Sequence, residues 1–110
     1  MNTGDAQNPP SYYAVIFSSR RADGDNGYQE TAQAMQELAA AMPGYIGFEA
    51  ARGEDGFGIA VSYWENEEAI ANWKKQIDHL AAQKRGRYEW YRDYTVRVAK
   101  VTREYAMKRV

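Results

Sequence analysis

The stretch from Ser11 to Ser19, SYYAVIFSS, constrains the fold most, because it is apolar on both of its sides. Its aromatic and β-branched residues are typical of a strand. Successive side chains of a strand point to opposite faces. One face carries Tyr13, Val15 and Phe17, and the other carries Tyr12, Ala14 and Ile16. Both faces must therefore be covered, so helices on one side of the sheet leave a second side that needs a partner.

Turn and capping signals divide the rest of the chain into five further elements. In order these are a helix from about Tyr28 to Met42, strands at Tyr45–Arg52 and Phe57–Glu65, a helix that Asn66 caps, and a strand at Tyr94–Tyr105. The intervening Gly53–Gly58 predicts a tight turn, which makes the middle strands an antiparallel hairpin. The order β-α-β-β-α-β predicts an α+β fold of the ferredoxin-like kind, with four antiparallel strands and two helices on one face. A second copy placed sheet to sheet would cover the other face, so we expect a homodimer.

The two helices differ in their end signals. Asn26 is the predicted N-cap of the first helix, and Gln29 would complete a capping box. In the second helix the buried stripe passes through Trp73 and Ile77 and leaves His79 well to one side. We therefore predict a break near residues 76–78, where Asp78 would recap the chain. Beyond it the helix is expected to continue through Gly86 to about Trp90.

Composition excludes several classes of function. The chain of 110 residues is long enough for one domain, and its net charge of −1 argues against nucleic acid as the main partner. One histidine and no cysteine provide no metal-ligand cluster. No apolar run approaches the ~18 residues of a membrane span. Residues 1–10 lack the apolar core of a secretory signal, and we expect a disordered tail before a single domain at 11–110 of a cytoplasmic protein.

Charge is unevenly distributed along the chain. The stretch from Ala81 to Val110 contains nine lysines and arginines but only three acidic residues. Such a run attracts an anionic ligand in some proteins and forms a solvated face in most.

Functional signals concentrate between Val61 and Tyr94, which holds all three tryptophans and the only histidine. Counted from His79, the residues Gln83, Gly86 and Trp90 follow at four, seven and eleven positions, which is one face of a helix. A polar pair, a gap and an aromatic side chain on one face are typical of a pocket wall. The alternative is a helix flank that packs on the sheet through Trp90.

This stretch resembles the antibiotic biosynthesis monooxygenase family in the order and spacing of its residues. The residues that carry the resemblance are Trp64, Trp73, His79, Gln83, Gly86, Trp90, Tyr91, Tyr94 and Arg97. The resemblance spans about residues 11–104 and implies a dimeric α+β barrel, in which two ferredoxin-like protomers pack their sheets face to face. It also implies a pocket between the sheet and the helices of each protomer. Members of the family include cofactor-independent monooxygenases, heme-degrading monooxygenases and proteins with no known activity.

Heme degradation fits the resemblance poorly. Heme-degrading members place their ligand histidine ten residues after the pocket tryptophan that Trp73 matches, and this chain has Gln83 there. They also use an asparagine on the first strand, where this chain has Phe17-Ser18-Ser19. The resemblance therefore implies a cofactor-independent monooxygenase that acts on a small aromatic or quinol-like substrate, with no cofactor. The alternative is a non-catalytic dimer that binds a small apolar ligand, which the lack of a complete acid–base pair around His79 favours.

The resemblance and the residue types together give each candidate site residue a role. His79 would be the general base, because a neutral imidazole accepts a proton near neutral pH. Flat substrates stack on aromatic side chains, and an anion pairs with a guanidinium. The predicted substrate-binding residues are Trp73, Tyr63, Gln83, Trp90 and Arg97. Each also has a structural alternative: Trp73 in the core, His79 at a helix end, and Arg97 opposite a carboxylate across the dimer.

Overall fold

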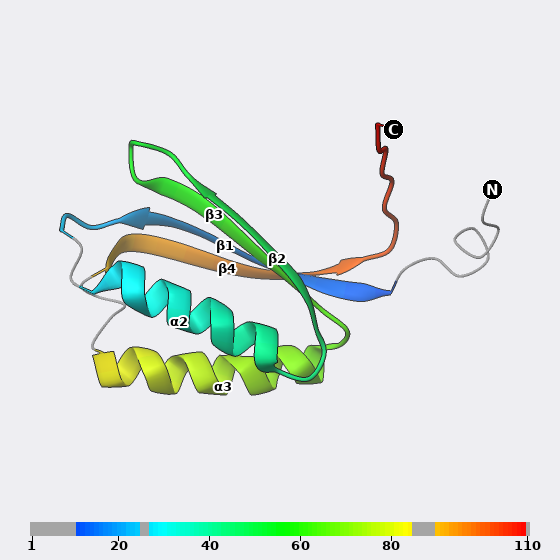
Figure 1. The fold of residues 1–110 in the computed structure, drawn as a ribbon, viewed down its shortest axis with the longest axis horizontal. Helices are drawn as coiled ribbons and strands as arrows, with labels where there is room; N and C mark the ends of the chain where they lie inside the picture. Colours follow the sequence, from blue (N-terminus) through cyan, green and yellow to red (C-terminus); the bar gives the residue numbers. More distant parts are fainter. Residues whose placement is uncertain (1–10, 25–26, 85–89, 110) are drawn as a thin grey trace.

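The computed structural model describes residues 11–24, 27–84 and 90–109 (Figure 1). Its elements are β1 (Tyr12–Arg21), α2 (Tyr28–Ala41), β2 (Tyr45–Arg52), β3 (Phe57–Trp64), α3 (Glu67–Lys84) and β4 (Tyr91–Val101). The strands form one sheet in the order β2-β3-β1-β4, and every neighbouring pair is antiparallel. The predicted ferredoxin-like order is therefore confirmed.

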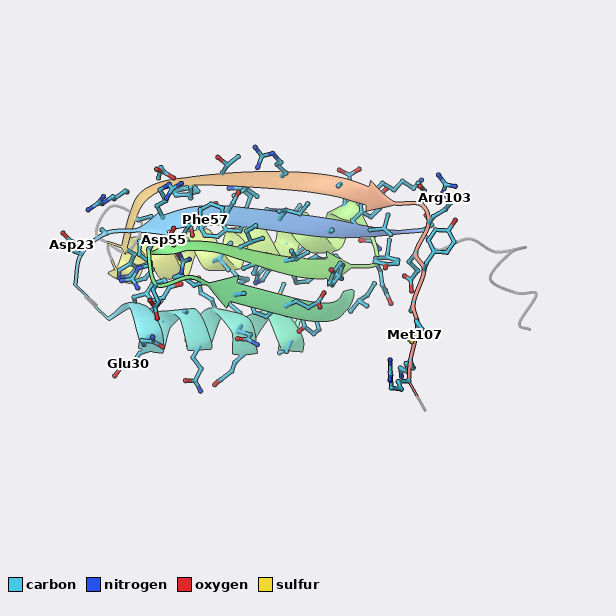
Figure 2. The ribbon with its side chains drawn as sticks, turned by 90° about the horizontal axis from the view of Figure 1, so that it is seen from above. Asp23, Glu30, Asp55, Phe57, Arg103 and Met107 are labelled. Atoms are coloured by element: carbon cyan, nitrogen blue, oxygen red, sulfur yellow. The ribbon has the colours of Figure 1, made fainter. Side chains whose placement is uncertain are left out.

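Both helices lie on one face of the sheet (Figure 1). Seen from the opposite face, α2 lies beyond the β2 edge, whereas β4 forms the other edge (Figure 2). The core lies between the layers, where Val15 of β1 and Trp64 of β3 pack with Ala39 of α2 and Ala69 of α3. We call this side of the sheet the helix face and the other side the open face.

The first and last strands of the chain, β1 and β4, start or end at residues that differ from those predicted. Strand β1 continues past Ser19 to Arg21, because the Arg21 N–H bonds to the Gly56 carbonyl at 3.0 Å and Arg21 pairs with Tyr91. The same pairing starts β4 at Tyr91 instead of Tyr94. The predicted extension of β4 to Tyr105 is wrong, since the ladder with β1 ends where Tyr12 meets Val101.

Helix α3 is unbroken, so the predicted break near residues 76–78 is wrong. Asp78 does not recap the chain. Its carboxylate lies 2.7 Å from the Lys74 ammonium, an i,i+4 pair that supports continuous helix. The predicted N-cap is confirmed at the start, where the Asn66 side chain accepts a hydrogen bond from the Ala69 N–H at 2.8 Å.

Helix α2 begins after Gly27, which adopts a left-handed conformation at φ 79°. The predicted cap Asn26 lies outside the described residues, as do Gly86 and the predicted tail at residues 1–10. The predicted hairpin turn is confirmed by the Gly53 N–H, which bonds to the Phe57 carbonyl at 2.8 Å.

The segment 102–109 leaves the end of β4 and runs away from the two layers (Figure 1). Tyr105 and Met107 are 87% and 80% exposed on it. The Tyr12 hydroxyl donates a hydrogen bond to the Glu104 carboxylate, which raises the pKa of Tyr12 to about 12. Across the described part of the chain, no helix is long and apolar enough to cross a membrane.

Candidate functional site

The strand register divides the helix face into transverse rows of side chains. Residues paired across neighbouring antiparallel strands point to the same face. Because Val15 and Trp64 contact the helices, the alternate residues of β1 and β3 also lie on the helix face. Three rows follow, each given from β2 to β4: Phe48–Ser62–Val15–Val98, Ala50–Ala60–Phe17–Val96 and Arg52–Gly58–Ser19–Tyr94.

Two tryptophans occupy the end of this face near the start of α3. The rings of Trp64 and Trp73 stack at 5.0 Å between centroids, and Tyr45 meets the edge of Trp64 at 5.7 Å. The Trp64 indole N–H donates to the Ser62 hydroxyl at 2.8 Å. The Trp73 indole N–H is buried and has no acceptor among the described residues. An unsatisfied buried donor costs roughly 1–3 kcal/mol, so an acceptor supplied by a ligand would be strongly favoured here.

A second aromatic cluster occupies the opposite end of the helix face. The Tyr91 ring contacts the rings of Phe17 and Tyr28 edge to face, with centroids 5.2 Å and 5.8 Å apart. The Tyr94 ring stacks on the Phe17 ring with centroids 5.3 Å apart. Trp90 is fully buried against Tyr28 at 6.2 Å. Burial raises the pKa of the Tyr91 phenol, and the neighbouring Tyr28 raises this pKa further. This cluster is therefore a neutral aromatic wall at ordinary pH.

The β4 side of the helix face is uncovered. Tyr94, Val96 and Val98 are 40%, 50% and 49% exposed, although their row partners on β1 are buried or half-buried. We call these three residues the β4 strip. Apolar side chains left exposed in a continuous line mark a contact surface for a ligand or another chain.

The surface also has two depressions. The larger, of 460 Å³, is lined by Arg20–Gly24, Glu54–Gly56 and Arg92. The smaller, of 220 Å³, lies beside Pro43 and Asn66. No group of three or more metal-ligating side chains occurs within the described ranges.

The family is decided by the comparison with known sequences. A family model described as "Antibiotic biosynthesis monooxygenase" matches residues 11–85. The chain belongs to the antibiotic biosynthesis monooxygenase family.

Two relatives of this family member are similar along most of its length. It is 53% identical over 95 residues to "Uncharacterized protein YqjZ" of Bacillus subtilis, covering 86% of this chain and 83% of that protein. It is 30% identical over 95 residues to "Jasmonate monooxygenase ABM" of Pyricularia oryzae, covering 82% of this chain. The match spans only 43% of that longer protein.

Solved structures agree on the fold. The cofactor-independent oxygenase SnoaB from Streptomyces nogalater has a TM-score of 0.66 at 12% identity, with 91% of this chain and all of SnoaB covered. A dabb family protein with a ferredoxin-like fold from Mesorhizobium loti has a TM-score of 0.56 at 14% identity, with 82% of this chain and 96% of that chain covered.

Two of the predicted site residues lie on the face of this family fold that the helices do not cover. Tyr63 and Arg97 alternate with the helix-face residues and lie on the open face. The Tyr63 hydroxyl donates to the Glu49 carboxylate at 2.8 Å, which raises the pKa of Tyr63. The Arg97 guanidinium reaches the Ser18 hydroxyl at 3.4 Å. The sheet therefore separates these two side chains from Trp73 in the same protomer.

The other predicted residues are also not gathered into one cluster. His79 is exposed on the unbroken α3, two positions beyond Ile77, which is half-buried. Trp90 belongs to the Tyr28 cluster, and Trp73 belongs to the Trp64 pair. The Gln83 side chain lies outside the described residues. Of the six predicted residues, Trp73 and Trp90 contact aromatic side chains of the helix face, at its two opposite ends.

Sequence reasoning missed three polar residues at the Tyr28 end of the helix face, together with the glycine that makes room for them. The polar residues are Ser19, Arg21 and Arg52, and the glycine is Gly58. Alternation along β3 could have placed Gly58 on the same face as Trp64, six positions later. The pairing that brings Arg52 and Ser19 beside it depends on register, which no local pattern in the chain reveals.

Proposed function

We propose that the protein is a cofactor-independent monooxygenase that oxidises a small aromatic, quinol-like substrate bound on the helix face. The observation that carries the proposal is the buried Trp73 indole N–H, which lies beside a stacked tryptophan and has no acceptor among the described residues. A substrate oxygen would satisfy this donor while its ring packs on aromatic side chains. The names of SnoaB and of the fungal relative point to the same class of reaction.

The reaction requires no redox group on the protein, because the substrate supplies the electrons. An anthrone-type substrate loses a proton to give an electron-rich anion, which reduces O₂. One oxygen atom replaces the two hydrogens of the reacting CH₂ as a carbonyl, and the other leaves as water. The site has to exclude bulk water and direct a hydrogen-bond donor at the developing negative charge. The Trp73 indole N–H is the donor that we assign to this role.

Oxygen uptake by the purified protein tests the proposal. We expect turnover with hydroquinones or anthrones in the presence of a chelator and without added flavin. A hemin titration monitored at the Soret band checks the separate prediction that no heme is bound tightly. The absence of oxygen uptake across the panel, together with stoichiometric hemin binding, would overturn the proposal.

Replacement of Trp73 by phenylalanine keeps an aromatic ring on Trp64 but removes the indole N–H. We expect substrate affinity to fall by ~10-fold, because one hydrogen bond to a charged oxygen is lost. The free energy of unfolding of the ligand-free protein should stay within about 1 kcal/mol of the parent, because the lost donor was unsatisfied. Ligand titration and urea unfolding measure the two effects. A large loss of stability with unchanged affinity would make Trp73 a core residue only.

His79, which is exposed on α3, is the proposed general base. In the oxygen-uptake assay, a rate ~100-fold lower for His79→Ala would assign proton removal to His79. A rate equal to the parent would mean that the substrate ionises unaided and that the protein acts by binding it.

A non-catalytic ligand-binding protein is the second candidate function. It is favoured by the exposure of His79 on α3, since bulk water reaches the proposed base. This candidate requires ligand binding without oxygen uptake. Calorimetry and oxygen measurements on the same ligand therefore separate it from the monooxygenase.

We also propose a homodimer that is formed through the open face. Phe57 and Ile59 are exposed there, beside half-buried Ile16 and Val61. Stable interfaces bury more than ~1,200 Å² in total. A charge placed at the centre of such an interface is left unpaired on association.

We expect the parent protein to sediment as a dimer at micromolar concentration and Ile59→Lys to sediment as a monomer. Val98→Lys is the matched control, because Val98 is similarly exposed but lies on the helix face. Sedimentation velocity measures all three proteins. A parent that sediments as a monomer would overturn the homodimer.

A further inference from the structure

Arg52, at the end of β2, lies across the helix face. Its side chain extends over Gly58, where an added Cβ atom would lie 2.6 Å from the guanidinium carbon. The guanidinium donates to the Ser19 hydroxyl at 2.7 Å, to the Ser19 carbonyl at 3.3 Å and to the Gly56 carbonyl. A guanidinium has five N–H donors, so two of them remain after these three bonds. Gly58 thus makes room for a fixed guanidinium on the helix face of the sheet.

Arg21 approaches the same place from the end of β1. Its guanidinium carbon lies 3.6 Å from the centre of the Tyr28 ring, and that of Arg52 lies 5.9 Å from the same ring. Arg21 donates to the carbonyls of Trp90 and Gly24 at 2.9 Å each, which leaves three of its five donors. Two hydrogen-bonded guanidiniums therefore lie close to the Tyr28 ring.

Neither of these two arginines forms an ion pair with a carboxylate of the described residues. Asp23 lies 3.8 Å from Arg92, Asp55 accepts a hydrogen bond from the Phe57 N–H at 3.1 Å, and Glu54 lines the same surface depression as Arg21. Both guanidiniums act to lower the pKa of Tyr91, in opposition to its burial. Two positive charges near one ring, one of them on the exposed Arg52, attract an anionic ligand to this end of the helix face.

We propose that Arg52 and Arg21 bind the carboxylate of an apolar organic acid whose body lies along Phe17 and the β4 strip. The inference goes beyond the proposed function, because it assigns a ligand to the Tyr28 end of the helix face, whereas Trp73 lies at the opposite end. A planar guanidinium matches a carboxylate with two parallel hydrogen bonds, which selects this group over a neutral alcohol. Tyr94 is next to Ser19 in the row that Arg52 begins, so the apolar strip starts where the charged group ends.

The alternative role for these arginines is purely structural, since they tie the β2–β3 turn and the start of β4 to β1. A pair of isosteric probes separates the two roles. We would measure dissociation constants for 2-naphthoate and for neutral 2-naphthylmethanol by calorimetry. We expect the parent to prefer the carboxylate by ~10-fold or more.

The variants test which residues cause that preference. Arg52→Gln should bring the two dissociation constants within about twofold of each other, whereas Arg92→Gln, at the same end but paired with Asp23, should keep the parent preference. Gly58→Ala is a second route, since its methyl group would lie 2.6 Å from the guanidinium carbon and displace the guanidinium without removing its charge. It should also abolish the preference, and circular dichroism verifies that each variant is folded.

The outcomes discriminate between failures of the two proposals. Equal binding of both probes by the parent overturns the carboxylate site and leaves an aromatic site in place. Binding of neither probe overturns the carboxylate site and leaves the Trp73 site to be decided by oxygen uptake. A preference that survives in both Gly58→Ala and Arg52→Gln assigns the two arginines to structure alone.

Discussion

Replacing Trp64 by alanine is expected to lower the free energy of unfolding by about 3–5 kcal/mol, the range for deletion of a large core aromatic side chain. Trp64 is 0% exposed and lies between Tyr45 and Trp73, so no surface adjustment refills its volume. The substitution also removes the donor that bonds to the buried Ser62 hydroxyl. Domains of this size have only about 5–15 kcal/mol of stability in total, so the variant should be close to unfolding.

Urea unfolding followed by tryptophan fluorescence measures the effect. Tyr105→Ala is the matched control, because this aromatic residue is 87% exposed on the segment after β4 and should change stability by less than about 0.5 kcal/mol in the monomer. A loss below 1 kcal/mol for Trp64→Ala would mean that the two helices can collapse onto the sheet without this side chain.

Replacing Gly44 by alanine is expected to lower the free energy of unfolding by about 2–5 kcal/mol. Gly44 has φ 87°, a left-handed conformation that costs a residue with a Cβ atom about 1–2 kcal/mol. An added Cβ would also lie 2.6 Å from the Cβ of Ala69 in α3, and such overpacking costs roughly 1–3 kcal/mol. The strain is hard to relieve, because the Gly44 carbonyl accepts a hydrogen bond from the Glu65 N–H at 2.8 Å.

Gly27→Ala separates the two contributions. Gly27 has a similar φ of 79°, but in the part of the chain that the structure describes no atom beyond its chain neighbours and its own helix backbone lies within 4 Å of the position of its added Cβ. Its replacement should therefore cost only about 1 kcal/mol from the backbone. Thermal unfolding of both variants provides the comparison. Equal losses of stability in the two variants would show that Ala69 of α3 moves away from the added Cβ at residue 44 without an energetic cost.

The separation of Tyr63 and Arg97 from Trp73 changes how the family site is interpreted in this chain. Alternation already placed Tyr63 and Trp64 on opposite faces of the same strand. Trp73 stacks on Trp64, so Tyr63 cannot join it within one protomer. The resemblance led us to group residues that the two-residue period of a strand keeps apart.

The sequence by itself determined the elements whose signals are local. Alternating apolar residues predicted the strands and their faces, the glycines of the 53–58 turn predicted the hairpin, and Asn66 predicted the start of α3. These signals act between residues a few positions apart, so they survive in any tertiary context that keeps the element. The family pattern was likewise readable from order and spacing.

Only the tertiary structure decided the strand ends, the continuity of α3 and the composition of the helix-face rows. The ends of β1 and β4 follow from their mutual pairing, and Asp78 pairs with Lys74 instead of capping a new helix. The row that joins Arg52, Gly58, Ser19 and Tyr94 takes one residue from each strand. A shift of one residue in any pairing would turn a side chain of that row to the open face, so the charged end of the site exists only once all four strands are in register.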